Sequence, residues 1–417
     1  MTAPALDRRL GTPDAVLLGL ASMVGAGVFS VFGPAARAAG DGLLLGLGIA
    51  AVVAYCNAVA SAQLAAAMPI SGGTYAYGRA RLGTWWGFTA GWGFVVGKTA
   101  SCAAMALTFA TYLLPGSWGG QRLVAVVAVA ALAALNLRGV TRTALVSRIL
   151  VTATLLALAI VIVAVLLSGA RRPEAGPLLG GPVGVLQSAG LLFFAFAGYA
   201  RIATMGEEVR DPARTIPRAI PLALGITVVL YAAVGAVLLL VLGPAALAGA
   251  SAPLDAAVRA AGATALLPVV RAGAAVASLG ALLALIAGVG RTILAMARNR
   301  DLPGWLAAVH PVRRVPHRAE VVLAACVTVL VLTLDLRGAI GFSSFGVLVY
   351  YAIANASAFT QPSAERRWPR ALNVLGAVGC LTLVVTLPPQ TVVAGIAVFA
   401  VGLLGRVLVL GLSSRRG

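Results

Sequence analysis

The segment Ser22-Met23-Val24-Gly25-Ala26-Gly27-Val28-Phe29 lies in the middle of an apolar stretch that runs from residue 13 to residue 38. A second segment, Phe193-Phe194-Ala195-Phe196-Ala197-Gly198-Tyr199-Ala200, takes the same middle position in the stretch 184–206. Glycine lets a helix unwind, and unpaired backbone inside a membrane is tolerated only where it lines a cavity or meets a ligand. The two segments predict two broken membrane helices around one binding site, although such glycines can also serve close helix packing alone.

The composition of the 417-residue chain indicates a polytopic membrane protein. Hydrophobic residues make up 60% of the sequence and charged residues 10%, and the mean hydropathy is +0.99. A hydrocarbon core about 30 Å thick requires about 20 apolar residues per helix. Stretches of this kind predict twelve membrane helices, at residues 13–38, 42–67, 84–113, 122–138, 143–168, 184–206, 218–243, 265–296, 319–335, 338–360, 371–387 and 391–411.

The two breaks lie five predicted helices apart, which is the pattern of an inverted repeat. We expect helices 1 to 5 (residues 13–168) and helices 6 to 10 (residues 184–360) to form the two repeats. Residues 371–411 then add two C-terminal helices outside them. The predicted fold class is an all-α polytopic membrane protein with a five-plus-five inverted repeat, in which helices 1 and 6 are discontinuous.

The distribution of arginine predicts the orientation of the chain. Of the 31 basic residues, 23 arginines fall on the side that holds both termini, seven fall on the other side, and the remaining residue is a lysine. Cytoplasmic flanks of membrane helices are enriched in Lys and Arg, so both termini are predicted to be cytoplasmic, in the plasma (inner) membrane. The net charge of +19 is then a topology signal and no sign of nucleic-acid binding. The preference for Arg, with abundant Ala, Gly and Val, is typical of a GC-rich bacterial genome.

Lys98 is the single lysine of the chain and lies in the middle of the stretch 84–113. An ammonium at mid-bilayer costs about 2.5 to 3.5 kcal/mol even on the mildest scale, so such a residue normally faces the bundle interior or a cavity. Gly25, Lys98, Thr154 and Ala197 lie within about two residues of the midpoints of their predicted helices, or about 3 Å of axial rise. These four positions are expected to border one chamber at the midplane.

Three segments carry a resemblance to a known family. They are Met23-Val24-Gly25-Ala26-Gly27-Val28-Phe29; Phe194 to Tyr199 with Glu207-Glu208-Val209-Arg210-Asp211-Pro212 and Ile216-Pro217; and Arg291-Thr292-Ile293-Leu294-Ala295-Met296-Ala297-Arg298 with Leu302-Pro303. On these motifs, and on hydropathy along nearly the whole chain, the sequence resembles the amino acid-polyamine-organocation superfamily of permeases with the LeuT-like fold. The resemblance implies a secondary transporter for amino acids or related amines that works by alternating access.

The same resemblance implies a substrate site between the two breaks, where the substrate carboxylate meets backbone amides of helix 1 and its amino group meets carbonyls of helix 6. The implied residues are Met23, Val24, Gly25, Ala26 and Gly27 in the first break, and Phe194, Ala195, Phe196, Ala197 and Gly198 in the second. The physical reading agrees, because an unwound helix start presents N–H groups and an unwound helix end presents C=O groups. An aromatic residue of the second break is expected to help close the site.

The sequence differs from the family at the positions that usually bind the coupling ion. Many proton-coupled relatives carry a lysine in helix 5, where the alignment puts Thr154, and helix 8 has Gly288 and Gly290 where a sodium site would need hydroxyls. Lys98 is therefore the candidate for a relocated proton-coupling or charge-mimicking group, because burial disfavours its charged form. Two alternatives stay open: Lys98 binds an acidic substrate side chain, or it ties helices together through carbonyl contacts.

The positions of the charged residues limit the class of substrate and suggest a gate. No Asp or Glu reaches mid-depth, so a cationic substrate side chain would lack a partner, which favours a neutral, small or aliphatic amino acid. Glu207 and Glu208 follow helix 6 and have several arginines near them in the sequence. Charge pairs there could form a cytoplasmic gate, or the segment could be an ordinary solvated loop. Pro212, Pro217 and Pro221 are expected to mark the turn into helix 7.

Other functional classes fit the sequence less well. An intramembrane enzyme would need paired carboxylates, a His cluster or an activated nucleophile at depth, and the deep ionisable groups are Lys98 and cysteine thiols alone. His310 and His317 are too few for a metal site, and neither a metal nor a cofactor is expected. The expected partners are an amino acid substrate, protons and the lipid bilayer. The remaining alternatives are an amino acid exchanger, an organic amine transporter and a non-transporting amino acid sensor; the sequence leaves the oligomeric state open.

Overall fold

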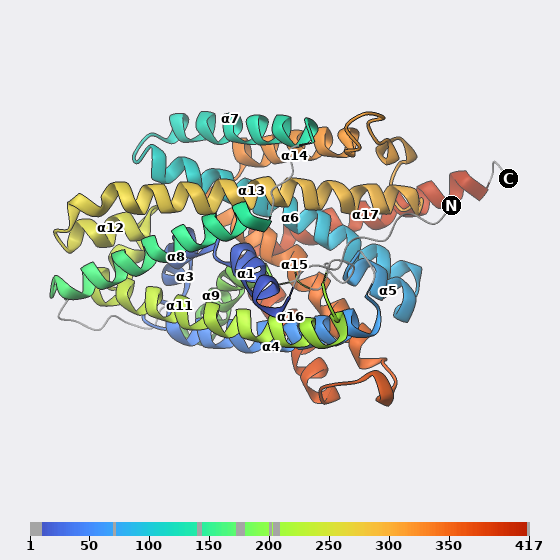
Figure 1. Cartoon of the computed structure of the whole chain (residues 1–417), viewed down its shortest axis with the longest axis horizontal. Coiled ribbons are helices and arrows are strands. Elements are labelled where there is room, and N and C mark those ends of the chain that lie inside the picture. The colour runs from blue at the N-terminus through green and yellow to red at the C-terminus, as the bar shows by residue number, and fades with distance from the viewer. Residues whose placement is uncertain are drawn as a thin grey trace.

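The computed structural model of the chain describes residues 11–69, 72–139, 144–171, 180–199, 202 and 209–414. Within these ranges the regular structure is helical, and the long helices run side by side along the long axis of the molecule (Figure 1). The α-helices are α1 Thr12–Met23, α2 Ala26–Ser30, α3 Phe32–Ala39, α4 Leu43–Ala67, α5 Thr74–Leu82, α6 Thr84–Leu113, α7 Trp118–Leu137, α8 Ala144–Leu167, α9 Gly181–Phe196, α11 Pro212–Gly249, α12 Pro253–Ala260, α13 Leu267–Arg298, α14 His317–Thr333, α15 Leu336–Phe359, α16 Arg370–Thr386 and α17 Pro389–Ser414. Three short 3-10 helices are η1 Thr264–Leu266, η2 Gly304–Ala307 and η3 Ser363–Glu365.

The helices confirm a polytopic membrane protein. Among the described residues, nine helical segments are long and apolar enough to cross a bilayer, the first of them Thr12–Ser30, which contains α1 and α2. The apolar helices α9 and α16 are shorter. The count of twelve membrane helices and the five-plus-five repeat stay predictions.

The start of α11 differs from the predicted turn. The helix begins at Pro212, and Pro217 and Pro221 lie inside it, so the prediction of a proline-marked turn into this helix was wrong at these two positions. A proline within a helix removes one backbone hydrogen bond. The helix continues because its apolar face is fully buried here, as Ile216 and Ile220 show.

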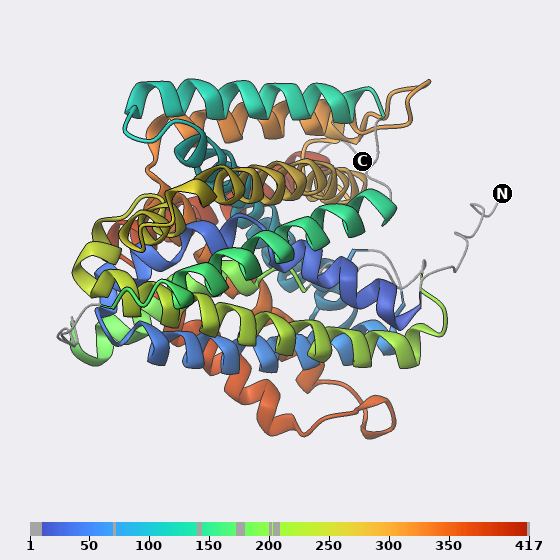
Figure 2. The same ribbon diagram turned by 60° about the vertical axis from the view of Figure 1, so that its left-hand side comes forward.

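The interior is built on α6 and α15, which pack against each other through glycines. A Cβ atom added to Gly346 would lie 2.7 Å from the carbonyl oxygen of Gly93 and 2.8 Å from the Cα atom of Gly97. Small residues let membrane helices approach this closely, where dispersion contacts and backbone dipoles replace the missing hydrophobic drive. Figure 2 shows α7 with α14 along one edge of the bundle, and α4 with α11 on the opposite side, where α16 lies beyond them.

A buried ionic cluster fixes one end of the bundle, which we call the inner end and which holds the start of α6 and the end of α13. Asp301 accepts hydrogen bonds from the Tyr75 hydroxyl and from Arg79, both at 2.7 Å, and pairs with Arg406 of α17 at 3.0 Å. Arg406 also donates to the Thr84 carbonyl at 2.7 Å. Burial and the bond to Asp301 raise the pKa of Tyr75 to about 12, so its hydroxyl stays protonated. The cluster joins α5, α6 and α17 to the segment that follows α13.

Candidate functional site

The first break lies between α1 and α2. The helix α1 ends at Met23, Val24 adopts φ −79° and ψ 64°, and Gly25 adopts φ −111° and ψ −144°. No side chain caps α2 at Ala26, so its first amides have no intrahelical acceptor. Val31 keeps helical angles, and α2 therefore leads directly into α3. The chain presents a helix start at this depth, as the sequence predicts.

The second break lies where α9 ends. The helix stops at Phe196, and Ala197, Gly198 and Tyr199 form a turn. The carbonyls of the last helical turn then have no intrahelical donor. The predicted gate residues Glu207 and Glu208 lie outside the described residues.

The two breaks are in direct contact. A Cβ atom added to Gly27 would lie 2.7 Å from the Cβ atom of Ala195, and one added to Gly198 would overlap the carbonyl of Ser22. Only glycine fits at either position without a shift of the neighbouring backbone. The geometry joins the two predicted halves of the site across 171 residues of chain, from Gly27 to Gly198.

Tyr231 of α11 bridges the two breaks. Its hydroxyl lies 2.7 Å from the Met23 carbonyl oxygen and 3.1 Å from that of Ala195, within hydrogen-bond range of both. Its ring packs against Phe196 with centroids 5.1 Å apart. One phenol therefore lies within reach of a carbonyl in each broken helix, although the Met23 carbonyl also accepts from the Gly25 amide at 2.8 Å. The sequence did not identify Tyr231.

Lys98 reaches the second break from α6. Its Nζ atom donates to the carbonyl oxygen of Ala197 at 3.0 Å, and the side chain is 8% exposed. The Tyr351 hydroxyl of α15 points at the same carbonyl from 3.5 Å. A carbonyl at a helix end carries partial negative charge, so it is a suitable partner for an ammonium. Of the four positions predicted to share the midplane, Lys98 and Ala197 are in contact.

Thr154 and Gly25 face other neighbours. The buried Thr154 hydroxyl donates at 2.9 Å to the Leu150 carbonyl of its own helix, α8. Gly25 faces α13, where an added Cβ atom would lie 3.2 Å from that of Ala281. Among the described residues no hydrogen bond links Thr154 to either break, and its hydroxyl already has a hydrogen-bond acceptor within α8.

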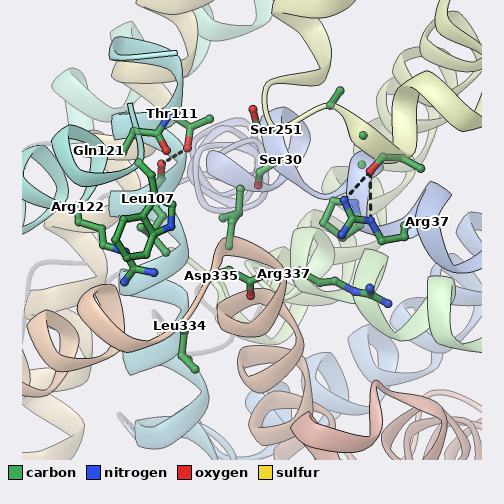
Figure 3. A pocket seen from close by; sticks show the side chains of 17 residues that line it. Ser30, Arg37, Leu107, Thr111, Gln121, Arg122, Ser251, Leu334, Asp335 and Arg337 are labelled. Atoms are coloured by element: carbon green, nitrogen blue, oxygen red, sulfur yellow. Dashed lines mark hydrogen bonds between the residues drawn. The ribbon is translucent and has the colours of Figure 1, made fainter. Parts of the chain in front are cut away.

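A cavity of about 230 Å³ opens at the end of the bundle opposite the ionic cluster, which we call the outer end (Figure 3). Ser30, Leu107 and Thr111 line its wall, and Arg37, Arg122 and Arg337 stand around it. Ser30 lies three residues beyond Gly27, so the cavity approaches the first break from outside. Phe29, which lies between Gly27 and Ser30 in the chain, packs edge-on against Tyr112 with ring centroids 5.7 Å apart, and the Tyr112 hydroxyl donates to the Phe29 carbonyl at 2.8 Å.

The signal that could have identified Tyr231 and Tyr351 is the presence of phenols inside apolar helices. A buried tyrosine hydroxyl usually finds a hydrogen-bond partner, and in a membrane the freed carbonyls of a broken helix are the available acceptors. Which tyrosine reaches which carbonyl depends on tertiary packing. The residue types were therefore visible in the sequence, whereas their assignment to the breaks was not.

Comparisons with known proteins show which family the chain is similar to. The amino acid permease family model matches residues 10–407. An uncharacterized transporter of Mycobacterium tuberculosis is 61% identical over 399 residues, which cover 95% of this chain and 90% of the relative. A branched-chain amino acid permease of Bacillus subtilis is 26% identical over 430 residues, covering 96% and 92% of the two chains. The chloroplastic cationic amino acid transporter 7 of Arabidopsis thaliana is 29% identical over 386 residues, covering 85% and 65%.

The family match spans nearly the whole chain and includes both breaks, Lys98 and the inner ionic cluster. Its members and the relatives above are membrane transporters and not enzymes. The resemblance inferred from the sequence motifs is confirmed. The chain belongs to the amino acid permease family.

Proposed function

We propose that the protein carries neutral, small or aliphatic amino acids across the bacterial plasma membrane by alternating access, driven by a proton gradient. The observation that carries this proposal is the contact between the two helix breaks, with Lys98 bonded to Ala197 at their border. Residues 13–168 and 184–360 would act as the two repeats of the transport cycle. The proposal includes Glu207 and Glu208 as the cytoplasmic gate.

A zwitterion matches the chemistry of the two breaks. The amides at the start of α2, from Ala26 on, have no side-chain cap and suit a carboxylate. The carbonyls of Ala195 and Ala197 suit an ammonium group. In the present conformation Tyr231 and Lys98 occupy these two carbonyls, so a bound amino group would share or replace their hydrogen bonds.

The absence of a deep carboxylate supports a neutral substrate side chain. Within the described ranges, the buried Asp301 pairs with two arginines at the inner end, and the buried Asp255 pairs with Arg259 and Arg271, so neither is free to bind a cationic side chain. The third buried carboxylate, Glu320, lies in the first turn of α14, away from the two breaks. Two family relatives are named for branched-chain and for cationic amino acids, so this argument from charge favours the first class.

Lys98 provides a physical basis for proton coupling. A protonated Lys98 holds the Ala197 carbonyl as a bound cation would, and this contact stabilises the turn at the end of α9. Loss of the proton weakens that hydrogen bond, because a neutral amine is a poorer donor than an ammonium. Protonation would therefore favour the conformation in which the two breaks form one site, and deprotonation would favour release.

The test is uptake of labelled amino acids into proteoliposomes that hold the purified protein, with and without an inward proton gradient. We expect small and aliphatic neutral amino acids to accumulate only with the gradient. Uptake that needs internal substrate and ignores the gradient would show an exchanger instead. Binding without any uptake would show a sensor and would overturn the proposal.

A further inference from the structure

A second line of polar groups runs from the Lys98 region to the inner end, outside the contact between the two breaks. We call it the polar column and define it by Asn57, Ser61 and Gln63 of α4, Asn355 of α15, Gln361 just after α15, and Cys380 of α16. Apart from Ser61, which is 3% exposed, these side chains are fully buried. The helices α4, α15 and α16 pack against one another along it.

The upper end of the column meets the acceptor of Lys98. The Tyr351 hydroxyl points at the Ala197 carbonyl, and the Tyr351 and Tyr199 rings pack with centroids 5.0 Å apart. The Tyr199 hydroxyl faces the side chains of Tyr351 and Asn57. Two phenols therefore connect the Lys98 contact to the first residue of the column.

The middle of the column is a cluster of amides. Asn355 Nδ2 donates to Asn57 Oδ1 at 2.6 Å, and Cys380 Sγ lies 3.3 Å from the same oxygen. Gly376 makes room for this cluster, since a Cβ atom there would lie 2.5 Å from Asn355 Oδ1. Ser61 lies four residues after Asn57, one helical turn nearer the inner end.

The lower end of the column reaches the inner surface. Gln361 Nε2 lies 3.4 Å from the Gln63 carbonyl oxygen, and Gln63 Oε1 accepts from the Arg367 amide at 3.4 Å. Arg366 donates to the Gln361 carbonyl at 2.9 Å. Arg366, Arg367 and Glu365 line a surface hollow at this point. The column thus places buried polar groups at intervals between the Lys98 region and the surface of the inner end.

The column is only partly satisfied by protein hydrogen bonds. Five buried atoms along it have no hydrogen-bond partner among the described residues: Asn57 Nδ2, Ser61 Oγ, Gln63 Nε2, Asn355 Oδ1 and Gln361 Oε1. A buried polar atom left without a partner costs about 1 to 3 kcal/mol, and ordered water is its usual partner inside proteins. Polar residues that served only to join helices would be paired with each other. The five unpartnered atoms therefore favour a hydrated path.

We propose that the polar column carries protons between Lys98 and the inner surface, on a route separate from that of the amino acid. The N–H bond of the ammonium breaks, the electron pair stays on Nζ, and the proton binds a water oxygen and passes along hydrogen-bonded water to bulk water inside. The titratable groups beside this path are Cys102 near Lys98, then Tyr199, Tyr351, Cys380 and Cys56, with Glu365, its partner Arg81, Arg366 and Arg367 at its exit. The inference rests on the proposed proton coupling.

The test compares Asn57→Leu and Asn355→Leu with a matched control. Asn136→Leu removes another buried interhelical asparagine, whose Nδ2 donates to the Leu283 carbonyl at 3.1 Å in the contact between α7 and α13. We expect each column variant to lower gradient-driven accumulation about tenfold while exchange at equal pH stays within about twofold of the unmodified protein. The control should keep both activities.

The outcomes separate the two proposals. If the unmodified protein ignores the gradient, the proposed coupling fails. If it responds and both column variants respond equally, the column is not the proton route. Loss of accumulation and exchange together in both variants would assign a packing role to the column and would also overturn the inference.

A second measurement needs no transport. In protein carrying Cys56→Ala, Cys102→Ala and Cys326→Ala, a small cationic methanethiosulfonate added from the inner side should modify Cys380, because its thiol borders the hydrated path. Asn57→Leu in the same background should slow this reaction. A Cys380 thiol that resists the reagent in folded protein would mean a dry column and would overturn the inference.

Discussion

The Nζ atom of Lys98 lies 3.0 Å from the carbonyl oxygen of Ala197, one residue beyond the end of α9. The contact joins the deep cation of the chain to the turn that borders the proposed substrate site. It also connects two explanations that the sequence alone leaves open, because a lysine that binds a carbonyl can both stabilise the fold and respond to protonation. Transport measurements distinguish the structural role of Lys98 from the proton-coupling role.

Replacing Lys98 by methionine should uncouple transport from the proton gradient. Methionine fills the volume but cannot donate to Ala197, so accumulation should fall by the 5- to 150-fold that a coupling free energy of about 1 to 3 kcal/mol implies. The measurement is proteoliposome uptake with and without an inward proton gradient. Lys98→Arg is the informative partner variant, since its charge is permanent and should allow binding without proton release. A Lys98→Met protein that still concentrates substrate in response to the gradient would refute the coupling role.

Removing the Tyr231 hydroxyl should weaken substrate binding. Tyr231→Phe removes a donor from both carbonyls; the Met23 carbonyl keeps the Gly25 amide at 2.8 Å, whereas the Ala195 carbonyl loses its side-chain donor, at a cost of about 1 to 3 kcal/mol for a buried unpaired group. We expect KM to rise about tenfold, with a smaller change in the maximal rate. Tyr55→Phe is the control, because Tyr55 is 41% exposed. An unchanged KM in the Tyr231 variant would show that the hydroxyl does not organise the site.

A methyl group at Gly198 should separate the two breaks. Its Cβ atom would overlap the Ser22 carbonyl, so Gly198→Ala must displace backbone, which typically costs about 1 to 3 kcal/mol. We expect loss of transport and a lower thermal midpoint in detergent. Gly288→Ala on α13 is the matched control, since nothing lies within 4 Å of its added Cβ atom. Equal behaviour of the two variants would contradict the close contact of the breaks.

The inner ionic cluster should contribute strongly to stability. Arg406→Gln leaves the buried Asp301 with Arg79 and the Tyr75 hydroxyl, so it should cost about 1.5 to 3 kcal/mol, as expected for loss of one hydrogen bond to a charged group. The exposed pair between Arg214 and Asp211 offers a control, because Arg214→Gln should change stability by less than about 1 kcal/mol. Thermal unfolding of both variants is the measurement. A double variant that adds Asp301→Asn to Arg406→Gln should be more stable than the sum of the two single changes, since they remove partners of one contact.

The sequence predicted the membrane class, and it predicted those parts of the candidate site whose residue types are unusual in the middle of a membrane helix. A single lysine in an apolar stretch, and glycines at the middle of two apolar helices, are expensive unless they serve a site, so Lys98, Gly27 and Gly198 were recognisable. The family resemblance added the roles of the backbone around them.

The parts that the sequence did not reveal depend on long-range packing. Tyr231 and Tyr351 differ from ordinary interfacial tyrosines only in which carbonyls they face. Asp301 and Arg406 are separated by 105 positions and meet only when α17 packs on the start of α6. Pro217 and Pro221 were misread because burial of one helix face can outweigh two lost hydrogen bonds.

Tyr231 also limits how the two broken helices can separate. Its hydroxyl carries one proton and spans acceptors at 2.7 and 3.1 Å, and a hydrogen bond is lost when the two atoms move about half an ångström beyond that range. Separation of α1 from α9 is therefore not gradual at this point. When the two helices move apart, the Tyr231 hydroxyl can stay hydrogen-bonded to only one of the two carbonyls. The Tyr231 hydroxyl therefore has two discrete hydrogen-bonded states. Its O–H stretching frequency should switch between two values during the cycle instead of shifting gradually.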